Sequence, residues 1–322
     1  MQPVQGIHHI TAFASDPQAN VDFYHNILGQ RLVKTTVNFD DPGTYHFYYG
    51  DKIGTPGTIM TYFPWPYARR GVRGNGEIGA YAYFIDSDSL GFWQKRLAAY
   101  GIPTSKTESR FGVDVLPFQD PDGMALELIV SDDHSPIQFW EDGPVPAERA
   151  LRGFHGVTLW LAEAEQTGTL LTEQMGYALV GQEGNRWRFR GAGNMGPYVD
   201  ILVDPNRPHG RMGAGSVHHV AFRTTDDAEQ LEYQQALAMA GFGVTEVRDR
   251  QYFHSIYFRS PGGVLFEIAT AAPGFYIDEP IETLGQSLKL PPWLEPHRQK
   301  IEDVLPTFTI KPIEKEGEAV HA

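Results

Sequence analysis

Two histidine doublets are the residues of this chain best suited to binding a metal ion. His8-His9 lies near the start of the chain and His218-His219 lies in its last third. Neutral imidazole is a common metal ligand, and a carboxylate often completes such a site. Glu267 is a suitable carboxylate because it lies in an apolar run, residues 264–269, that should bury it. A buried carboxylate without a partner is costly, so Glu267 needs a cation, a metal ion or a proton.

The residues next to each doublet predict which histidine faces a shared site. Adjacent residues of a strand point to opposite faces of the sheet. The first histidine of each doublet shares its face with apolar residues typical of a surface packed under helices (Ile10 and Ala12; Val220 and Phe222). We therefore expect His9 and His219 to be the metal ligands, together with Glu267. His8 and His218 should then lie behind them.

An internal repeat predicts the elements that hold these residues. Each repeat opens with a β-rich run, continues with an amphipathic helix such as 16–28 or 226–240, and closes with a glycine-containing turn and a strand. The opening runs are 6–10, 80–85, 154–159 and 217–222, and the closing strands are 58–63, 124–130, 198–203 and 264–270. The pattern predicts four modules, with the helices ending near glycine.

The repeat predicts an α+β protein of four tandem βαβββ modules that form two domains of open, curved mixed sheets. Residues 1–145 would form the first domain, with modules 1 and 2 and His9. Residues 146–272 would form the second, with modules 3 and 4, His219 and Glu267. Residues 273–322 would form a C-terminal tail with one short helix at 296–304.

The distribution of the doublets among the modules favours a functional role. Modules 1 and 4 carry a doublet, module 3 has only His155-Gly156, and module 2 has no histidine at this position. A doublet needed for folding should occur in every copy. The other histidines fit no pattern and receive no role: His25, His46, His134, His209, His297 and His321.

The number of ligands indicates the kind of chemistry. When the closing strands of the four modules are aligned by their turns, the position of Glu267 is occupied in the other modules by Tyr62, Glu127 and Asp200. Tyr62 offers no second carboxylate from module 1, so three protein ligands leave about three octahedral positions open, as in non-haem Fe(II) sites that bind a substrate and O2. Glu127 and Asp200 have no ligand histidine beside them, so we interpret them as structural or as vestigial metal ligands.

Composition excludes several other classes of function. The chain of 322 residues has no cysteine, which rules out disulfides and thiolate-bound metals. Its net charge of −14 without a basic stripe argues against nucleic acid. No apolar stretch is long enough for a membrane helix, and no leader sequence is visible. We expect a soluble, cytoplasmic protein.

Taken together, the motifs resemble the vicinal oxygen chelate superfamily, which includes glyoxalases, bleomycin resistance proteins and extradiol dioxygenases. Within it they are most similar to the dioxygenases that cleave the ring of para-hydroquinones. The resemblance covers nearly the whole chain and rests on the segments 7–11, 28–34, 54–58, 63–64, 152–155, 218–222 and 261–267.

The resemblance implies the same ligands that the strand faces predict. His9, His219 and Glu267 would bind Fe(II), although another divalent metal can occupy such a site in a purified sample. It also implies catalytic roles near the metal for Tyr257, His218, His8 and Arg250. The substrates would be a small aromatic molecule and O2, and we expect the pocket wall to include Trp65, Tyr252 and Phe253.

Two other functions stay open from the sequence. A glyoxalase-type isomerase or lyase uses the same fold but needs a carboxylate base at the metal. A non-catalytic protein that binds a quinone or a drug would not need the three ligands. The ring substituents of the substrate and the oligomeric state, a homo-oligomer included, are not determined by the sequence.

Overall fold

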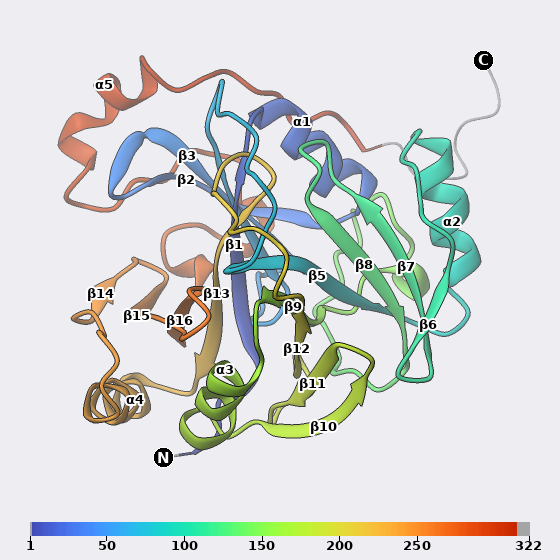
Figure 1. Cartoon of the computed structure of the whole chain (residues 1–322). Helices are drawn as coiled ribbons and strands as arrows, with labels where there is room; N and C mark the ends of the chain where they lie inside the picture. Colours follow the sequence, from blue (N-terminus) through green and yellow to red (C-terminus); the bar gives the residue numbers. More distant parts are fainter. Residues whose placement is uncertain (1, 314–322) are drawn as a thin grey trace.

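In the computed structural model, which describes residues 2–313, the chain forms the four βαβββ modules that the repeat predicts (Figure 1). Module 1 contains β1 (Ile7–Ala14), α1 (Pro17–Val21), the π-helical turn η1 (Asp22–Ile27), β2 (Arg31–Asn38), β3 (Asp41–Gly50) and β4 (Ile59–Pro64). Module 2 contains β5 (Glu77–Ile85), α2 (Leu90–Ala99), β6 (Glu108–Arg110), β7 (Val113–Gln119) and β8 (Ala125–Val130).

The second half of the chain repeats this order. After the short turn η2 (Ala147–Arg149), module 3 contains β9 (Phe154–Leu161), α3 (Glu165–Thr169), η3 (Leu170–Gln174), β10 (Ala178–Glu183), β11 (Arg186–Arg190) and β12 (Tyr198–Val203). Module 4 contains β13 (Val217–Thr224), α4 (Asp227–Met239), β14 (Arg248–Asp249), β15 (Phe253–Arg259) and β16 (Leu265–Pro273). The tail contains η4 (Phe275–Ile277), η5 (Ile281–Thr283), η6 (Glu295–His297) and α5 (Arg298–Glu302).

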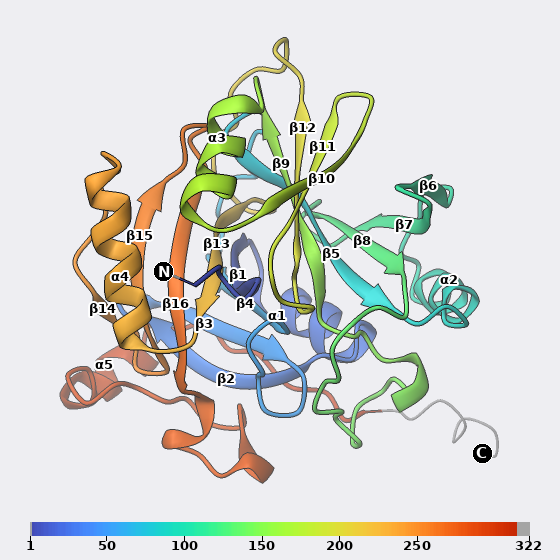
Figure 2. The same ribbon diagram turned by 90° about the horizontal axis from the view of Figure 1, so that it is seen from below.

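Within residues 2–313 the strands form two curved, mixed sheets of eight strands each (Figures 1 and 2). The strand order is β14-β15-β16-β13-β1-β4-β3-β2 in one sheet and β10-β11-β12-β9-β5-β8-β7-β6 in the other. In each module the opening strand pairs in parallel with the closing strand, and the opening strands of two modules pair antiparallel at the centre of the sheet. The predicted fold class is confirmed.

Each sheet combines modules from both halves of the chain. Modules 1 and 4 share the first sheet, and modules 2 and 3 share the second. The predicted division after residue 145 falls between modules 2 and 3, so both predicted domains contribute strands to each sheet. This division stays a prediction. The consequence for the site is that β1 and β13, which carry the histidine doublets, are neighbouring strands.

The helices begin and end where their local sequence requires. The side chain of Asp16 accepts a hydrogen bond from the Ala19 backbone, and the side chain of Asp226 accepts one from the Glu229 backbone. Such caps satisfy backbone N–H groups that have no partner inside the helix. After α4 the chain reverses at Gly241, whose φ of 88° favours glycine.

The tail is anchored to β2 by a buried lysine. Lys34 is fully buried, and its Nζ lies 2.6 Å from an oxygen of Asp278 and 2.5 Å from an oxygen of Glu279. The Lys289 backbone also donates a hydrogen bond to the Thr35 carbonyl. The short helix predicted at 296–304 corresponds to η6 and α5.

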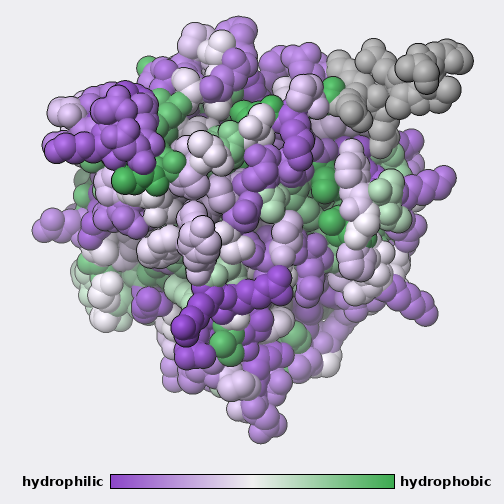
Figure 3. All heavy atoms as spheres, turned by 90° about the horizontal axis from the view of Figure 1, so that it is seen from above, coloured by the Kyte–Doolittle hydropathy of each residue, from purple (hydrophilic) through white to green (hydrophobic). Residues whose placement is uncertain are grey.

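The surface is mostly polar on the face shown in Figure 3, where hydrophobic side chains form only small, separate groups. No helix within residues 2–313 has the length and apolar character needed to cross a membrane.

Candidate metal centre

Three neighbouring strands bring the predicted ligands together. His9 lies on β1, His219 on β13 and Glu267 on β16, and these strands are adjacent in the order β16-β13-β1. The antiparallel register places His9 opposite Ala221, and the parallel register places Ala221 beside Glu267. The three side chains therefore meet on one face of the sheet.

The distances between the three side chains suit a single metal ion. The Nε2 atoms of His9 and His219 lie 3.2 Å apart. Oε2 of Glu267 lies 3.4 Å from Nε2 of His9 and 2.8 Å from Nε2 of His219. With metal–ligand bonds of about 2.1 Å, neighbouring octahedral ligands lie about 3 Å apart and opposite ligands about 4.2 Å apart. All three separations match neighbouring positions, which is the facial arrangement of two histidines and one carboxylate.

The surroundings of Glu267 fit a cation at this point. Its side chain is fully buried, and Oε1 accepts a hydrogen bond from the Ser255 hydroxyl at 2.5 Å. Within residues 2–313 no donor reaches Oε2 with hydrogen-bond geometry, although both imidazole nitrogens are close to it. Burial alone would raise the pKa of Glu267, but the two histidines outweigh burial and hold its pKa well below the ordinary value. An ionised carboxylate with one free, buried oxygen is a good metal ligand.

Each ligand histidine contacts the first histidine of its doublet. The Nδ1 atoms lie 2.9 Å apart in His8-His9 and 2.8 Å apart in His218-His219. Burial lowers the pKa of His8 well below its ordinary value and lowers the pKa of His218 to about 3, so both rings are neutral. If His9 and His219 donate their Nδ1 hydrogens across these contacts, the lone pairs of their Nε2 atoms face Glu267, as metal binding requires.

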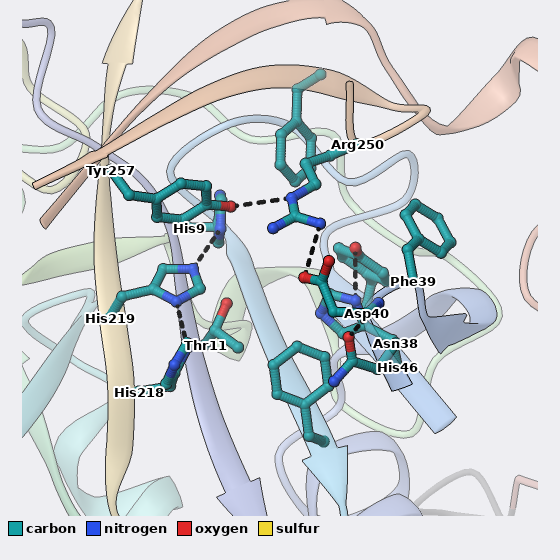
Figure 4. Close-up of a pocket in the computed structure, with 13 residues that line it drawn as sticks. His9, Thr11, Asn38, Phe39, Asp40, His46, His218, His219, Arg250 and Tyr257 are labelled. Atoms are coloured by element: carbon teal, nitrogen blue, oxygen red, sulfur yellow. Dashed lines mark hydrogen bonds and ion pairs between the residues drawn. The ribbon is translucent and has the colours of Figure 1, made fainter. Parts of the chain in front are cut away.

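A cavity of about 90 Å³ opens over the two ligand histidines (Figure 4). It is lined by imidazole, aromatic and polar side chains: His9, Thr11, Asn38, Phe39, Asp40, His46, Tyr48, Phe63, His218, His219, Arg250, Phe253 and Tyr257. Glu267 is fully buried and is not among the residues that line the cavity. A metal ion at the three ligands would thus be reached from this cavity.

Tyr257 and Arg250 lie at the metal side of the cavity. The antiparallel register of β15 and β16 places Tyr257 directly opposite Glu267. Arg250 donates a hydrogen bond from Nε to the Tyr257 hydroxyl at 3.2 Å, and its Nη1 lies 3.1 Å from a carboxylate oxygen of Asp40 (Figure 4). Burial raises the pKa of Tyr257, so its hydroxyl stays protonated. Asp40 belongs to the turn between β2 and β3, so this chain of contacts joins modules 1 and 4.

The predicted pocket wall is only partly correct. Phe253 lines the cavity, but Trp65 and Tyr252 do not. Trp65 is 49% exposed and lies beside Phe13, outside the cavity. Tyr252 lies behind the wall, where its hydroxyl donates a hydrogen bond to Asp278.

His46 and Asp40 line the cavity but received no role from the sequence. His46 alternates with Tyr48 on β3, and both side chains face the cavity. This alternation is the sequence signal that could have indicated His46. No comparable signal marks Asp40, which lies in a turn.

Thr61, not Tyr62, occupies in module 1 the position that Glu267 occupies in module 4. Glu267 on β16 pairs with Ala221, which lies two positions after His219 on β13. In the same way, Thr61 on β4 pairs with Thr11, which lies two positions after His9 on β1. The turn before β4 contains one glycine where the turn before β16 contains two. This difference in length shifted the alignment by one residue, and a shift of one residue exchanges the two faces of a strand.

Tyr62 therefore points into the core instead of toward the metal centre. Its hydroxyl donates a hydrogen bond to Tyr24 and lies 3.1 Å from the Tyr81 hydroxyl. Thr61 carries a hydroxyl and not a carboxylate, so module 1 still adds no second carboxylate. The prediction of three protein ligands is therefore unchanged, although Thr61 and not Tyr62 is the residue on which it rests.

The corresponding carboxylates of the second sheet are neutralised by arginines. Glu127 accepts two hydrogen bonds from Arg110, at 2.7 and 3.0 Å. Asp200 accepts two from Arg188, at 2.8 and 2.9 Å, and a third from Arg186. Both carboxylates are buried, as are Arg110 and Arg188. The contacts agree with the structural role expected of Glu127 and Asp200.

Comparison with known proteins relates the chain to a large superfamily. The family model described as Glyoxalase/Bleomycin resistance protein/Dioxygenase superfamily matches residues 6–128 and 153–268. "Putative ring-cleaving dioxygenase MhqO" of Bacillus subtilis (strain 168) is 48% identical over 309 residues, which cover 96% of this chain and 98% of the relative. "Chlorohydroquinone/hydroquinone 1,2-dioxygenase" of Sphingobium indicum is 39% identical over 303 residues, which cover 91% and 93%.

Solved structures share the architecture. A crystal structure of a "putative dioxygenase" from Bacillus subtilis aligns with a TM-score of 0.93 and 47% identity, covering 97% of this chain and 99% of that one. Glyoxalase I from Zea mays aligns with a TM-score of 0.64 and 14% identity, covering 88% and 97%. The maize enzyme is similar in fold alone.

Proposed function

The chain belongs to the glyoxalase/bleomycin resistance protein/dioxygenase superfamily, and we propose that within it the protein is an Fe(II)-dependent dioxygenase that cleaves the ring of a hydroquinone beside a hydroxyl group. The observation that carries this proposal is the convergence of His9, His219 and Glu267 at the spacing of three neighbouring ligands. The names of relatives that match nearly the whole chain support the same reaction and the same class of substrate.

His9, His219 and Glu267 would hold the metal ion and leave the cavity side of its coordination sphere free. Bound there, Fe(II) supplies the redox activity and the open positions that a spin-restricted reaction between O2 and an aromatic ring requires. Ser255 holds one oxygen of Glu267 and so keeps the other directed at the ion.

Tyr257 and Arg250 would act on the substrate. Because Arg250 donates to the Tyr257 oxygen, the hydroxyl hydrogen of Tyr257 is free to point into the cavity. That hydrogen can stabilise negative charge as it develops on a substrate oxygen. The raised pKa of Tyr257 keeps the hydrogen in place.

The remaining wall would orient the ring and limit access of water. Phe39, Phe63 and Phe253 provide apolar surface around the opening to the ligands. A small cavity with aromatic walls suits a single aromatic ring better than an extended substrate. The proposed substrates are therefore a small hydroquinone and O2.

The two alternatives receive less support. A glyoxalase-type isomerase needs a second carboxylate at the metal, and the corresponding position holds the hydroxyl of Thr61. A protein that only binds a quinone would not need three buried ligands of this spacing. Neither alternative has an observation in its favour beyond the shared fold.

The proposal is tested by reconstituting the protein with Fe(II) under anaerobic conditions and measuring O2 uptake. We expect uptake with at least one member of a panel of hydroquinones, and ring-opened products that contain both atoms of labelled O2. Parallel samples loaded with zinc, nickel or manganese test whether iron is required. No uptake across the hydroquinones and catechols would refute the dioxygenase proposal.

A further inference from the structure

A row of four hydrogen-bonded side chains crosses three neighbouring strands beside the metal centre. Thr11 lies on β1, Thr61 on β4, and His46 and Tyr48 on β3. The Thr61 hydroxyl donates to the Thr11 hydroxyl at 2.9 Å. His46 continues the row, with Nε2 lying 2.9 Å from the Thr61 hydroxyl and Nδ1 lying 2.9 Å from the Tyr48 hydroxyl. We call these four residues the polar row.

The number of hydrogens determines the direction of the row. Burial lowers the pKa of His46 well below its ordinary value, so its ring is neutral and has one N–H group. Thr61 uses its hydrogen on Thr11, so its oxygen receives the Nε2 hydrogen of His46. The Nδ1 atom then accepts the hydrogen of Tyr48. Four groups with one hydrogen each form three bonds, and the hydrogen left over is that of Thr11.

The remaining hydrogen has no acceptor in the protein. Thr11 lines the cavity, and among residues 2–313 its hydroxyl has no hydrogen-bond partner except the Thr61 hydroxyl that donates to it. Reversing all three bonds would move the free hydrogen to Tyr48, but it would also require Thr11 to donate to Thr61, whereas in the structure the Thr61 hydroxyl is the donor of that bond. The free hydrogen therefore lies on Thr11, which is itself buried, and a buried donor is costly unless a ligand in the cavity accepts its hydrogen.

We propose that the polar row makes Thr11 the hydrogen-bond donor for a second oxygen of the aromatic substrate, the one not bound to the metal, with His46 as the positioning residue. The inference rests on the proposed function in one respect, because it takes the first oxygen to be held at His9, His219 and Glu267. Thr11 follows His9 by two residues on the same face of β1, a separation of about 7 Å along the strand. That span accommodates one aromatic ring between its two oxygens.

The proposal assigns substrate specificity to this part of the wall. An oxygen substituent can accept the Thr11 hydrogen, whereas a methyl group at the same place leaves the hydrogen unpaired. Phe63 packs against His46 with ring centroids 4.3 Å apart, so the apolar wall offers no substitute acceptor there. The polar row should therefore favour hydroquinones over simple phenols of the same shape.

The test compares two ligands of equal shape without relying on turnover. Fe(II)-loaded protein is titrated anaerobically with hydroquinone and with 4-methylphenol, in which a methyl group replaces the second hydroxyl. One neutral hydrogen bond corresponds to a preference of about tenfold for hydroquinone in the wild-type protein. His46→Phe keeps the ring packing but removes both hydrogen bonds, and should reduce the preference to about onefold.

Three further variants distinguish positioning from a general structural effect. His46→Gln should keep most of the preference, because the amide can still donate to Thr61 and accept from Tyr48. Thr11→Val should lose the preference, with no further loss when it is combined with His46→Phe. Thr36→Val is the matched control, since Thr36 lies opposite His46 on β2 and its buried hydroxyl has no partner among the described residues.

The possible results separate this inference from the proposed function. The iron content of each variant is measured first, so that loss of metal is not mistaken for loss of preference. An undiminished preference in His46→Phe would overturn the inference and move the second oxygen toward Arg250. Equal weakening of both ligands, or no binding of hydroquinone to the wild-type protein, would also overturn it. The expected preference without any O2 uptake would support the polar row and overturn only the proposed reaction.

Discussion

The Nε2 atoms of His9 and His219 lie 3.2 Å apart although 210 positions separate the two residues in the chain. The antiparallel pairing of β1 with β13 produces this contact, and the parallel pairing of β13 with β16 adds Glu267. The proposed metal centre therefore depends on the first and last modules sharing one sheet. Metal binding should in turn stabilise that association.

We expect His219→Ala to abolish O2 uptake and to weaken Fe(II) binding by more than about 100-fold, because it removes one of three ligands. Metal affinity is measured by competition with a chelator under anaerobic conditions. His254→Ala is the matched control, since His254 is partly exposed and pairs with Asp227 away from the site. Iron retained at wild-type affinity in His219→Ala would show that the ligand assignment is wrong.

Ser255→Ala should lower metal affinity by about 10- to 100-fold while the protein stays folded. The Ser255 hydroxyl donates to Oε1 of Glu267, and without it the carboxylate can rotate away from the geometry that metal binding requires. The same competition assay measures the change. Ser260→Ala provides the control because the buried Ser260 hydroxyl has no hydrogen-bond partner among residues 2–313. Equal affinity of the two variants would contradict the supporting role of Ser255.

The parts of the fold that depend on local sequence could be predicted. Alternating strands, the caps at Asp16 and Asp226 and the turns that close each module identified the four modules. The strand-face argument also selected His9 and His219, because the direction of a strand side chain depends only on its position along the strand. The apolar run around Glu267 indicated the buried carboxylate, and the three side chains converge in the structure.

The parts that depend on pairing between distant strands could not be predicted. The histidine doublets predicted that modules 1 and 4 meet at one site, but the strand pattern did not predict that the two modules share one sheet. The difference of one residue between two turns moved the alignment from Thr61 to Tyr62, and only the strand register shows which one faces the site. Ser255 was missed because its role requires the register between β15 and β16.

Tyr257→Phe should lower kcat by about 100-fold and leave the iron content unchanged, because it removes a donor to charge that develops during the reaction. Steady-state O2 uptake with a saturating hydroquinone measures kcat, and metal analysis accompanies it. Tyr276→Phe, on an exposed tyrosine of the tail, serves as the control. A change confined to KM would indicate that Tyr257 binds the substrate without assisting the reaction.

Asp200→Asn should destabilise the protein by about 3–5 kcal/mol, because it leaves Arg188 buried without its charged partner. Urea unfolding measures the loss. Asp204→Asn, which affects a half-exposed pair with Arg207 at a longer separation of 3.7 Å, should cost less than about 1 kcal/mol. The folded Asp200→Asn protein should bind Fe(II) as tightly as the wild type. Weaker binding would contradict the purely structural role assigned to this carboxylate.

The stability of the protein should fall between pH 6.5 and pH 4, in part because of His25. This residue accepts a hydrogen bond at Nδ1 from the Leu32 backbone, and burial lowers its pKa to about 4. An unfolded histidine binds a proton with a pKa of about 6.5. The unfolded state therefore binds more protons in this range, and the stability present above pH 6.5 is lost as the pH falls.

At pH 5 the difference in proton binding at His25 alone corresponds to about 2 kcal/mol relative to pH 8. His25→Asn keeps an acceptor for the Leu32 backbone but cannot bind the proton. The change in the free energy of unfolding between pH 8 and pH 5 should thus be about 2 kcal/mol smaller in this variant than in the wild type, as measured by urea unfolding of both metal-free proteins. The same change in both proteins would show that His25 does not stay neutral in the folded state, and that other groups cause the acid sensitivity.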